Sequence, residues 1–250
     1  MMKIMKGCIM NLLKDFYFKK NKKINEMRAV FSKEETVQKR PIFPHCEKEF
    51  YALFITDTHS HLASNQKQFD MFLEDLPEID VIFFLGDIDY ADFNTLKTYK
   101  WFFKTDKYGI LGNHDYKNIL KENGVTNLHK NRINVHGVSF VGMEGSIKYK
   151  NMDAPMYTQE ESIEIAKELS DADVFLTHDK AYIEGENVPM QHAGLKGITN
   201  YLKEKKPSIH FHGHIHENEN EIIQYVPSYS IMRYACVKFS KDGISFVKRL

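Results

Sequence analysis

The chain has 250 residues, of which 42% are hydrophobic and 13% aromatic, and this suits one large domain or one domain with an extension. Lys and Arg together number 34, as do Asp and Glu, so the overall charge does not indicate a nucleic-acid or membrane partner. The three cysteines form no Cys-x-x-Cys pair, which argues against a disulfide framework and a thiolate zinc site. No segment approaches the roughly 20 apolar residues of a membrane span, and no signal peptide is recognisable, so we expect a cytoplasmic protein.

The N-terminal part of the chain differs in composition from the rest. We interpret residues 1–48 as a basic extension and connector, followed by one domain at 49–250. Residues 1–25 carry seven lysines and one aspartate, and their apolar residues fall at helical spacing. A basic amphipathic helix could contact a membrane surface or a partner. We favour a short appended helix or a partly disordered leader.

From residue 50 onwards, strand patterns alternate with helix patterns. Strands are predicted at 50–56, 81–85 and 108–111, and helices at 65–76 and 91–104, with a short helix before Gly124. This alternation indicates βαβ units and a mostly parallel sheet. Short strand patterns at 125–128, 132–135 and 138–143 then predict that a second or mixed sheet begins here.

The second half of the domain has clear helix and turn signals. Thr158 and Glu161 form a capping box that starts a helix ending near residue 169. Strands are expected at 174–177 and 209–212, on either side of a helix at 194–205. Three further strands, at 221–226, 231–239 and 244–249, complete the chain, and residues 241–243 supply the turn chemistry of a hairpin.

Polar residues of metal-ligating types follow five of these strands. The run Val81–Leu85 reads as a strand buried on both faces, and it stops at Gly86 and Asp87. Open α/β sheets gather their chemistry at the carboxyl ends of their strands, so Asp87 is placed where a ligand or metal would bind. The other four strands end on similar residues, and we expect all five ends to form one site. Its candidate ligands are Asp57, His59, Asp87, Asn113, His178, His214 and His216.

The chemistry of these side chains favours a divalent transition metal. Carboxylate, imidazole and amide oxygen without thiolate suit Mn²⁺, Fe²⁺ or Zn²⁺. Seven ligands are too many for one four-coordinate zinc ion. They suit two ions about 3.5–4 Å apart that share a bridging carboxylate, an arrangement used in phosphate ester hydrolysis.

The order of the motifs resembles that of a known family. Asp-x-His, Gly-Asp, Gly-Asn-His-Asp, a lone histidine after a strand, and Gly-His-x-His occur in this order within residues 50–250. The set is similar to that of the calcineurin-like metallophosphoesterases, and residues 190–217 resemble the small phosphodiesterase-type branch. The resemblance implies an α/β fold in which a β-sandwich of two mixed sheets is flanked by helices.

The resemblance also implies a role for each motif residue. Asp57, His59 and His216 would hold the first metal; Asn113, His178 and His214 would hold the second. Asp87 would bridge both. His114 would act as the acid that protonates the leaving oxygen. His192 would face the substrate, although a surface loop histidine is an equal alternative, and manganese is the favoured ion.

Some features depart from the family pattern. Tyr90 stands where many relatives have the Asp or Asn that supports the catalytic histidine, so Asp89, Asp92 or Asp115 would have to support His114 instead. An Arg-Gly pair is absent after Asp89, which disfavours the protein serine/threonine phosphatases.

Other polar residues are given weaker interpretations. His210 and His212 are expected to contact core or loop neighbours, and the remaining histidines receive no role. Lys148 and Lys150 lie in a plausible specificity loop, which is equally consistent with solvated charge.

We therefore expect a dinuclear-metal hydrolase of phosphate esters, acting on small or nucleotide-like phosphomonoesters or phosphodiesters through a metal-bridging hydroxide. One alternative is a nuclease, which would need a positively charged groove for DNA or RNA. Another is a non-catalytic metal-binding scaffold of the same fold. The sequence leaves the oligomeric state open.

Overall fold

The computed structural model describes residues 41–250, so the helix expected within residues 1–25 lies outside the described residues. Residues 41–48, expected to belong to the connector, contribute Phe43 and Cys46 to the core of the domain. In residues 41–250 no helix is long and apolar enough to cross a membrane.

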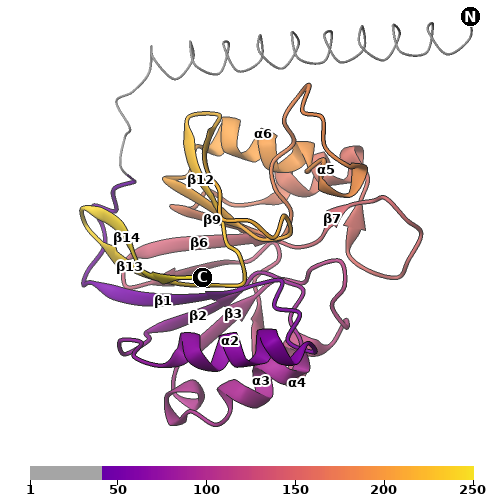
Figure 1. The fold of residues 1–250 in the computed structure, drawn as a ribbon. Coiled ribbons are helices and arrows are strands. Elements are labelled where there is room, and N and C mark those ends of the chain that lie inside the picture. Colours follow the sequence, from indigo (N-terminus) through magenta and orange to yellow (C-terminus); the bar gives the residue numbers. More distant parts are fainter. Residues whose placement is uncertain (1–40) are drawn as a thin grey trace, which may run out of the picture. The chain divides into compact units, whose positions relative to one another are not determined.

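Two six-stranded sheets form the centre of the domain (Figure 1). The strand order of the first is β14-β13-β1-β2-β3-β4, and that of the second is β11-β12-β10-β9-β6-β5. Both sheets are mixed, because parallel central strands adjoin antiparallel strands such as β13 and β5. This confirms the predicted fold class.

The strands of the first sheet are β1 (Phe50–Ile55), β2 (Val81–Phe84), β3 (Asp106–Gly109), β4 (Thr126–Asn127), β13 (Tyr234–Ser240) and β14 (Gly243–Arg249). Those of the second are β5 (Arg132–Val135), β6 (Val138–Met143), β9 (Val174–Thr177), β10 (Ile209–His212), β11 (Asn220–Ile223) and β12 (Val226–Ser230).

Aromatic side chains join the two sheets. Phe83 of β2 lies 4.6 Å from Phe140 of β6, and Phe54 of β1 lies 4.7 Å from Phe211 of β10, measured between ring centroids. These four rings are fully buried, and such pairs add about 0.5–1.5 kcal/mol beyond their area burial. The central strands are apolar on both faces because helices cover their outer sides.

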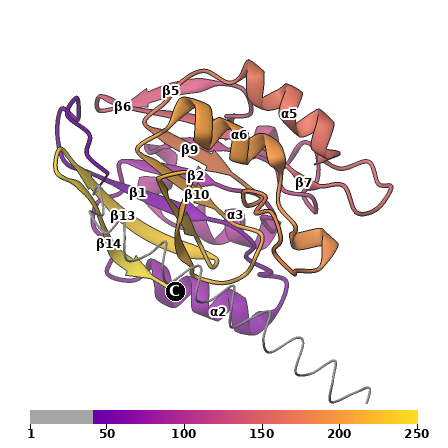
Figure 2. The ribbon, with the colours of Figure 1, turned by 90° about the horizontal axis from the view of Figure 1, so that it is seen from above.

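Helices flank each sheet on its outer face (Figures 1 and 2). The helices α2 (Ala63–Leu73), α3 (Tyr90–Leu96) and α4 (Ile119–Glu122) pack with the first sheet in one apolar cluster. The helices α5 (Gln159–Glu168) and α6 (Lys196–Lys205) pack on the second sheet in another. The layers therefore run helix, sheet, sheet, helix.

Several predicted elements are confirmed. The Thr158 hydroxyl accepts a hydrogen bond from the Glu161 backbone N–H, and the Glu161 carboxylate accepts one from the Thr158 N–H, so the capping box forms at the start of α5. The hairpin turn before Gly243 joins β13 to β14. His210 is buried between the hydroxyls of Thr177 and Ser228, as expected of a core histidine.

The predicted helix at 91–104 is wrong in its length. The helix α3 ends at Leu96, and a separate 3₁₀ helix covers Lys100–Phe103. Tyr99 between them has an extended backbone, and the Thr98 hydroxyl donates to the Thr95 carbonyl. Such a side-chain hydrogen bond competes with helix continuation.

Two strand predictions also need correction. The single strand expected at 221–226 is the hairpin of β11 and β12, which turns at Gln224 and Tyr225. Both residues have a positive φ, as a tight two-residue turn requires, but they lack the Asn-Gly signal that would have revealed it. The strand β4 pairs with β3 at the edge of the first sheet, so the second sheet begins only at β5.

Loss of an inter-sheet ring should destabilise the domain. We expect Phe83→Ala to lower the free energy of unfolding by about 3–5 kcal/mol, because a cavity replaces a fully buried ring. Urea denaturation monitored by circular dichroism measures this change. Phe103→Ala is the control, since Phe103 is exposed and its loss should cost less than about 0.5 kcal/mol. Equal losses for the two variants would contradict the sandwich core described above.

Candidate metal centre

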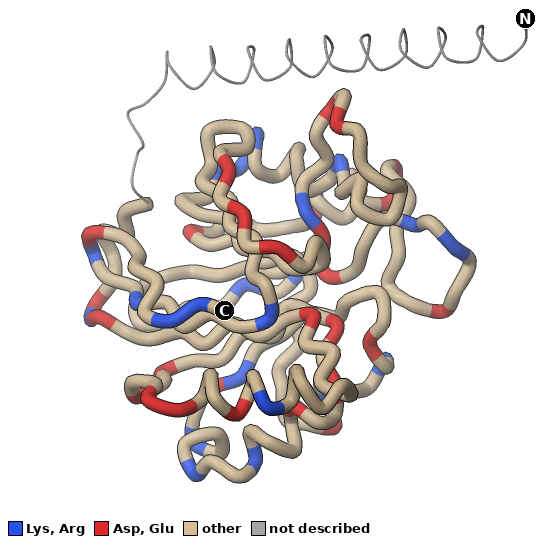
Figure 3. The backbone as a smooth tube through the Cα atoms, viewed as in Figure 1, with Lys and Arg blue, Asp and Glu red and all other residues tan. Residues whose placement is uncertain are grey.

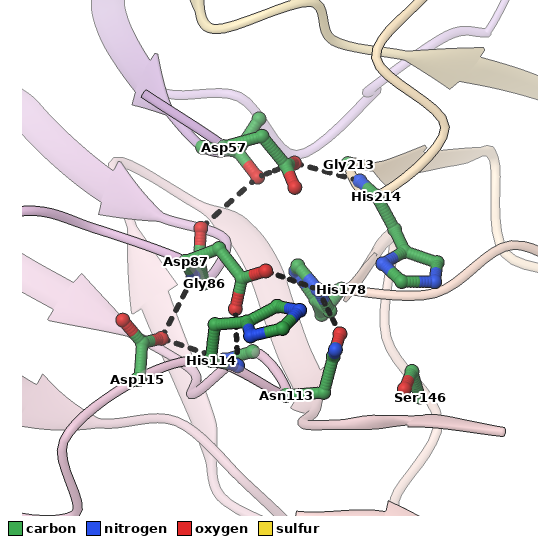
Figure 4. A network of polar contacts seen from close by, with 12 residues as sticks. Asp57, Gly86, Asp87, Asn113, His114, Asp115, Ser146, His178, Gly213 and His214 are labelled. Carbon is green, nitrogen blue, oxygen red and sulfur yellow. Dashed lines mark hydrogen bonds and ion pairs between the residues drawn. The ribbon is translucent and has the colours of Figure 1, made fainter. Parts of the chain in front are cut away.

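The carboxyl ends of strands from both sheets meet at one edge of the sandwich. Asp57 and Asp87 follow β1 and β2 of the first sheet, whereas His178 and His214 follow β9 and β10 of the second. Ligand atoms of these four residues all lie within 4.8 Å of one another (Figure 4). Four chain segments that are distant in sequence thus form one cluster.

The remaining predicted ligands adjoin this cluster on two sides. The amide oxygen of Asn113 lies 3.1 Å from Nε2 of His178. On the other side, Nε2 of His216 lies 3.3 Å from Oδ1 of Asp57 and 3.5 Å from Nε2 of His59. The structure therefore brings all seven candidate ligands together.

Small residues let these loops approach each other closely. Gly86 has a φ of +96°, and a Cβ atom at this position would lie 2.4 Å from the backbone nitrogen of Gly112. A Cβ atom on Gly112 would in turn lie 2.1 Å from Oδ1 of Asp87. Glycine is therefore required where the Gly-Asp and Gly-Asn-His-Asp loops touch.

The backbone of the ligand loops is strained. Five of the seven candidate ligands have a positive φ between 46° and 69°, and these are Asp57, His59, Asp87, His214 and His216. A residue with a side chain held in this region costs on the order of 1–3 kcal/mol and persists only where its surroundings enforce it.

A carboxylate enforces the conformation of the Asp87 loop. Asp115 accepts hydrogen bonds from the backbone N–H groups of Asp87, Ile88 and Gly112, at 2.8, 2.8 and 2.7 Å. Burial raises the pKa of Asp115 to about 6, with the nearby Asp87 as a second cause. The carboxylate therefore fastens the loop after β2 to the loop after β3.

A second carboxylate has the same role for the Asp57–His59 loop. Asp92 is buried and accepts hydrogen bonds from the hydroxyls of Thr58 and Ser60, both at 2.5 Å, and from the Asp89 backbone N–H at 3.0 Å. Thr58 lies between the candidate ligands Asp57 and His59, so Asp92 fixes the segment that carries both.

The three aspartates expected to support His114 bind other groups. Asp115 and Asp92 bind the groups just described, and Asp89 accepts from the backbone N–H and Nδ1 of His61, both at 3.0 Å. Within residues 41–250, none of these three carboxylates holds the His114 ring. His114 is exposed, and its backbone N–H donates to Oδ1 of Asp87 at 2.8 Å (Figure 4).

Backbone carbonyls fix which nitrogen of two histidines faces the centre. Nδ1 of His178 lies 2.8 Å from the Leu85 carbonyl oxygen, and Nε2 of His214 lies 2.7 Å from the Gln191 carbonyl oxygen. A carbonyl only accepts hydrogen bonds, so these nitrogens carry the protons. The other ring nitrogens are left free as ligands, which is the usual outer arrangement of metal-binding histidines.

The free nitrogen of His178 then faces oxygen atoms that are themselves hydrogen-bond acceptors. Nε2 of His178 points at Asn113 Oδ1 and lies 3.6 Å from Oδ2 of Asp87. Oδ1 of Asp57 is buried, and among residues 41–250 it has only the ion-pair contact with Nε2 of His216, 3.3 Å away. Converging acceptors of this kind require a positive charge, and the ligand types present fit a divalent cation.

The pKa values of His178 and Asp57 also show that the cluster favours a positive charge. Burial alone would lower the pKa of His178, but the carboxylates of Asp87 and Asp57 outweigh it and raise the pKa to about 9. Burial would raise the pKa of Asp57, but His178 and the hydrogen bond from His216 hold it well below its usual value. A proton on His178 and a metal ion are therefore alternatives, and metal binding should release that proton.

Some neighbours of the cluster carry no sequence signal. The Gln191 carbonyl and the Tyr149 hydroxyl, which lies 3.3 Å from Nδ2 of Asn113, were not predicted. His192 lies beside the cluster, with its ring centroid 5.1 Å from that of His214. Its role as a substrate contact stays a prediction.

Comparison with known proteins identifies relatives at the level of family and fold. A family model described as calcineurin-like phosphoesterase matches residues 50–218. No curated protein sequence matches the chain.

Solved structures share the fold at low sequence identity. One crystal structure aligns over 81% of this chain and 100% of its own, with a TM-score of 0.56 and 13% identity. TT1561 of Thermus thermophilus aligns over 80% of this chain and 98% of its own, with a TM-score of 0.50 and 14% identity. GAP50 of Plasmodium, described as the anchor in the inner membrane complex, aligns over 80% and 84%, with a TM-score of 0.51 and 12% identity.

We expect Asp115→Asn to weaken metal binding about 10- to 100-fold, because an amide NH₂ group would face backbone N–H donors and release the Asp87 loop. Isothermal titration calorimetry of the metal-free protein with Mn²⁺ measures the affinity. Asp106→Asn, an exposed site on β3, should leave the affinity unchanged. If Asp115→Asn binds Mn²⁺ as tightly as the unaltered chain, the carboxylate does not hold the loop.

Proposed function

The chain belongs to the calcineurin-like phosphoesterase family, and we propose that it is a metal-dependent hydrolase of phosphate esters that holds two divalent ions, with Mn²⁺ favoured. The observation that carries this proposal is the convergence of Asp57, Asp87, His178 and His214 with their acceptor atoms facing one another. Without a cation such a set destabilises the fold, because burying acceptors that lack a partner costs free energy.

The contacts support a division of the ligands into two groups. His216 and His59 adjoin Asp57, which suits one ion. Asn113 and His214 adjoin His178, which suits a second. Asp87 approaches His178 from the first sheet and is the carboxylate that would lie between the two ions.

Two ions held there would polarise the phosphoryl oxygens and lower the pKa of a water molecule to near neutrality. The chain's own residues would then orient the substrate and move protons. The backbone N–H of His114 is fixed on Asp87, which keeps its exposed ring at the rim of the centre. A histidine there would donate a proton to the leaving oxygen.

The charge distribution supports a small substrate rather than a polymer. In the view of Figure 3, the Lys and Arg positions are scattered among those of Asp and Glu along the backbone of residues 41–250. A nuclease would need a continuous basic track along the nucleic-acid backbone. We therefore propose small or nucleotide-like phosphomonoesters or phosphodiesters as substrates.

We also propose a cytoplasmic location. Cys46 and Cys236 are buried free thiols, which suits a reducing compartment.

Asp87→Asn tests the metal-dependent chemistry. The unaltered chain should bind two equivalents of Mn²⁺ and hydrolyse bis-p-nitrophenyl phosphate, while Asp87→Asn should lose metal and turnover because an amide cannot bridge two cations. Elemental analysis and a colorimetric assay measure the two properties. Asp75→Asn is a matched control, because Asp75 is an exposed aspartate that also has a positive φ.

If the wild-type protein is folded but binds no metal and hydrolyses no ester, it is a non-catalytic scaffold of this fold. Turnover of single-stranded DNA that falls steeply with salt would favour the nuclease.

His114→Ala separates catalysis from metal binding. We expect kcat to fall roughly 10²- to 10⁴-fold with metal content nearly intact, because the ring donates a proton and binds no metal. His45→Ala, at an exposed position far along the chain, is the control. Loss of metal together with activity would place His114 among the metal ligands.

A further inference from the structure

The segment that follows β6 is attached firmly to the metal centre. Its short strand β7 (Ser146–Ile147) pairs with β8 (Met156–Tyr157). The backbone N–H of Ile147 donates to Asp179 at 2.8 Å, next to the candidate ligand His178, and that of Lys148 donates to the Tyr157 carbonyl at 2.8 Å. The following residue, Tyr149, is therefore positioned by a small sheet and by the His178 loop.

The Tyr149 hydroxyl lies against a candidate ligand. It accepts a hydrogen bond from Nδ2 of Asn113 at 3.3 Å. This contact fixes the amide of Asn113 so that its oxygen faces His178 and the centre. A phenol also has one proton to donate, and within residues 41–250 no acceptor for that proton is present.

Tyr149 also lies where the buried cluster meets solvent. Asn113 is fully buried, whereas the next residue, His114, is exposed. Tyr149 itself is half-buried. Its free O–H can therefore reach a molecule that binds at the open side of the cluster.

A positive charge accompanies this hydroxyl. The ammonium nitrogen of Lys150 lies 4.9 Å from the centroid of the Tyr149 ring. This cation–π contact holds the lysine over the ring. No carboxylate within residues 41–250 forms an ion pair with Lys150, so its charge is available to an anion.

We propose that Tyr149 and Lys150 are the substrate-binding pair of the phosphoesterase centre, in which the Tyr149 hydroxyl donates a hydrogen bond to a phosphoryl oxygen and Lys150 attracts its charge. The proposal rests on the proposed function and deepens it. A terminal phosphate carries two negative charges and an internal diester carries one, so Coulomb attraction to Lys150 is stronger for the terminal phosphate. The pair therefore favours substrates with a terminal phosphate.

Orthophosphate binding to the Mn²⁺-loaded protein tests the hydroxyl. Removing a hydrogen bond to a charged group should weaken orthophosphate binding to Mn²⁺-saturated Tyr149→Phe about 10- to 100-fold. The Mn²⁺ affinity should fall less, because only the contact that orients Asn113 is lost. Isothermal titration measures both affinities, and Tyr225→Phe, at an exposed turn between β11 and β12, is the matched control.

The possible results separate three conclusions. Unchanged orthophosphate binding in Tyr149→Phe, with active wild type, overturns only the substrate contact. A loss of Mn²⁺ affinity as large as the loss of orthophosphate affinity would show that Tyr149 acts only by holding Asn113, which also overturns the substrate contact. Wild type that binds neither Mn²⁺ nor orthophosphate and hydrolyses no ester overturns the proposed function as well.

Two substrates of different charge test the lysine. We expect Lys150→Gln to lower kcat/KM for p-nitrophenyl phosphate several-fold more than for bis-p-nitrophenyl phosphate, because the first is a dianion and the second a monoanion. Lys203→Gln on the exposed side of α6 should change neither value. Equal losses for both substrates in Lys150→Gln would overturn the preference for terminal phosphates.

Discussion

Repulsion between converging acceptor atoms governs the centre of this protein. Two sheets direct carboxylate, imidazole and amide groups towards one point, and the Leu85 and Gln191 carbonyls fix which histidine nitrogens face inwards. Oδ1 of Asp57 is buried, and among residues 41–250 only Nε2 of His216, 3.3 Å away, forms an ion-pair contact with it. A positive charge at this point removes a desolvation cost that the fold otherwise bears. The chemistry that we propose follows from this requirement.

The geometry of the centre depends on packing between the sheets and on hydrogen bonds in the loops. Between the sheets, the Phe54–Phe211 and Phe83–Phe140 contacts keep a fixed separation. In the loops, Asp92 and Asp115 hold segments whose candidate ligands have left-handed backbone conformations. The ligand positions are thus preorganised by packing and hydrogen bonds, as precise metal sites require.

The fold class and the convergence of the candidate ligands were predictable because both leave local patterns in the sequence. A buried apolar strand followed by Gly86 and Asp87 marks the end of a strand at a functional edge. Five such ends in one order indicate a single site, and the structure gathers these residues as expected.

The supporting contacts were not predictable for a physical reason. Asp115 binds backbone N–H groups 28 and 27 residues away, and Tyr149 contacts Asn113 across 36 residues. Neither contact has a spacing rule, because loop positions depend on the whole sandwich. The turn at Gln224 and Tyr225 was missed because its residues adopt a conformation that their types disfavour.

Anomalous X-ray diffraction at the manganese edge, from crystals grown with Mn²⁺, would locate the ions relative to the Asp87 carboxylate. We expect two peaks about 3.5–4 Å apart, one on each side of this carboxylate. Peaks elsewhere on the molecule, or no peak at Asp87, would contradict the two-ion centre.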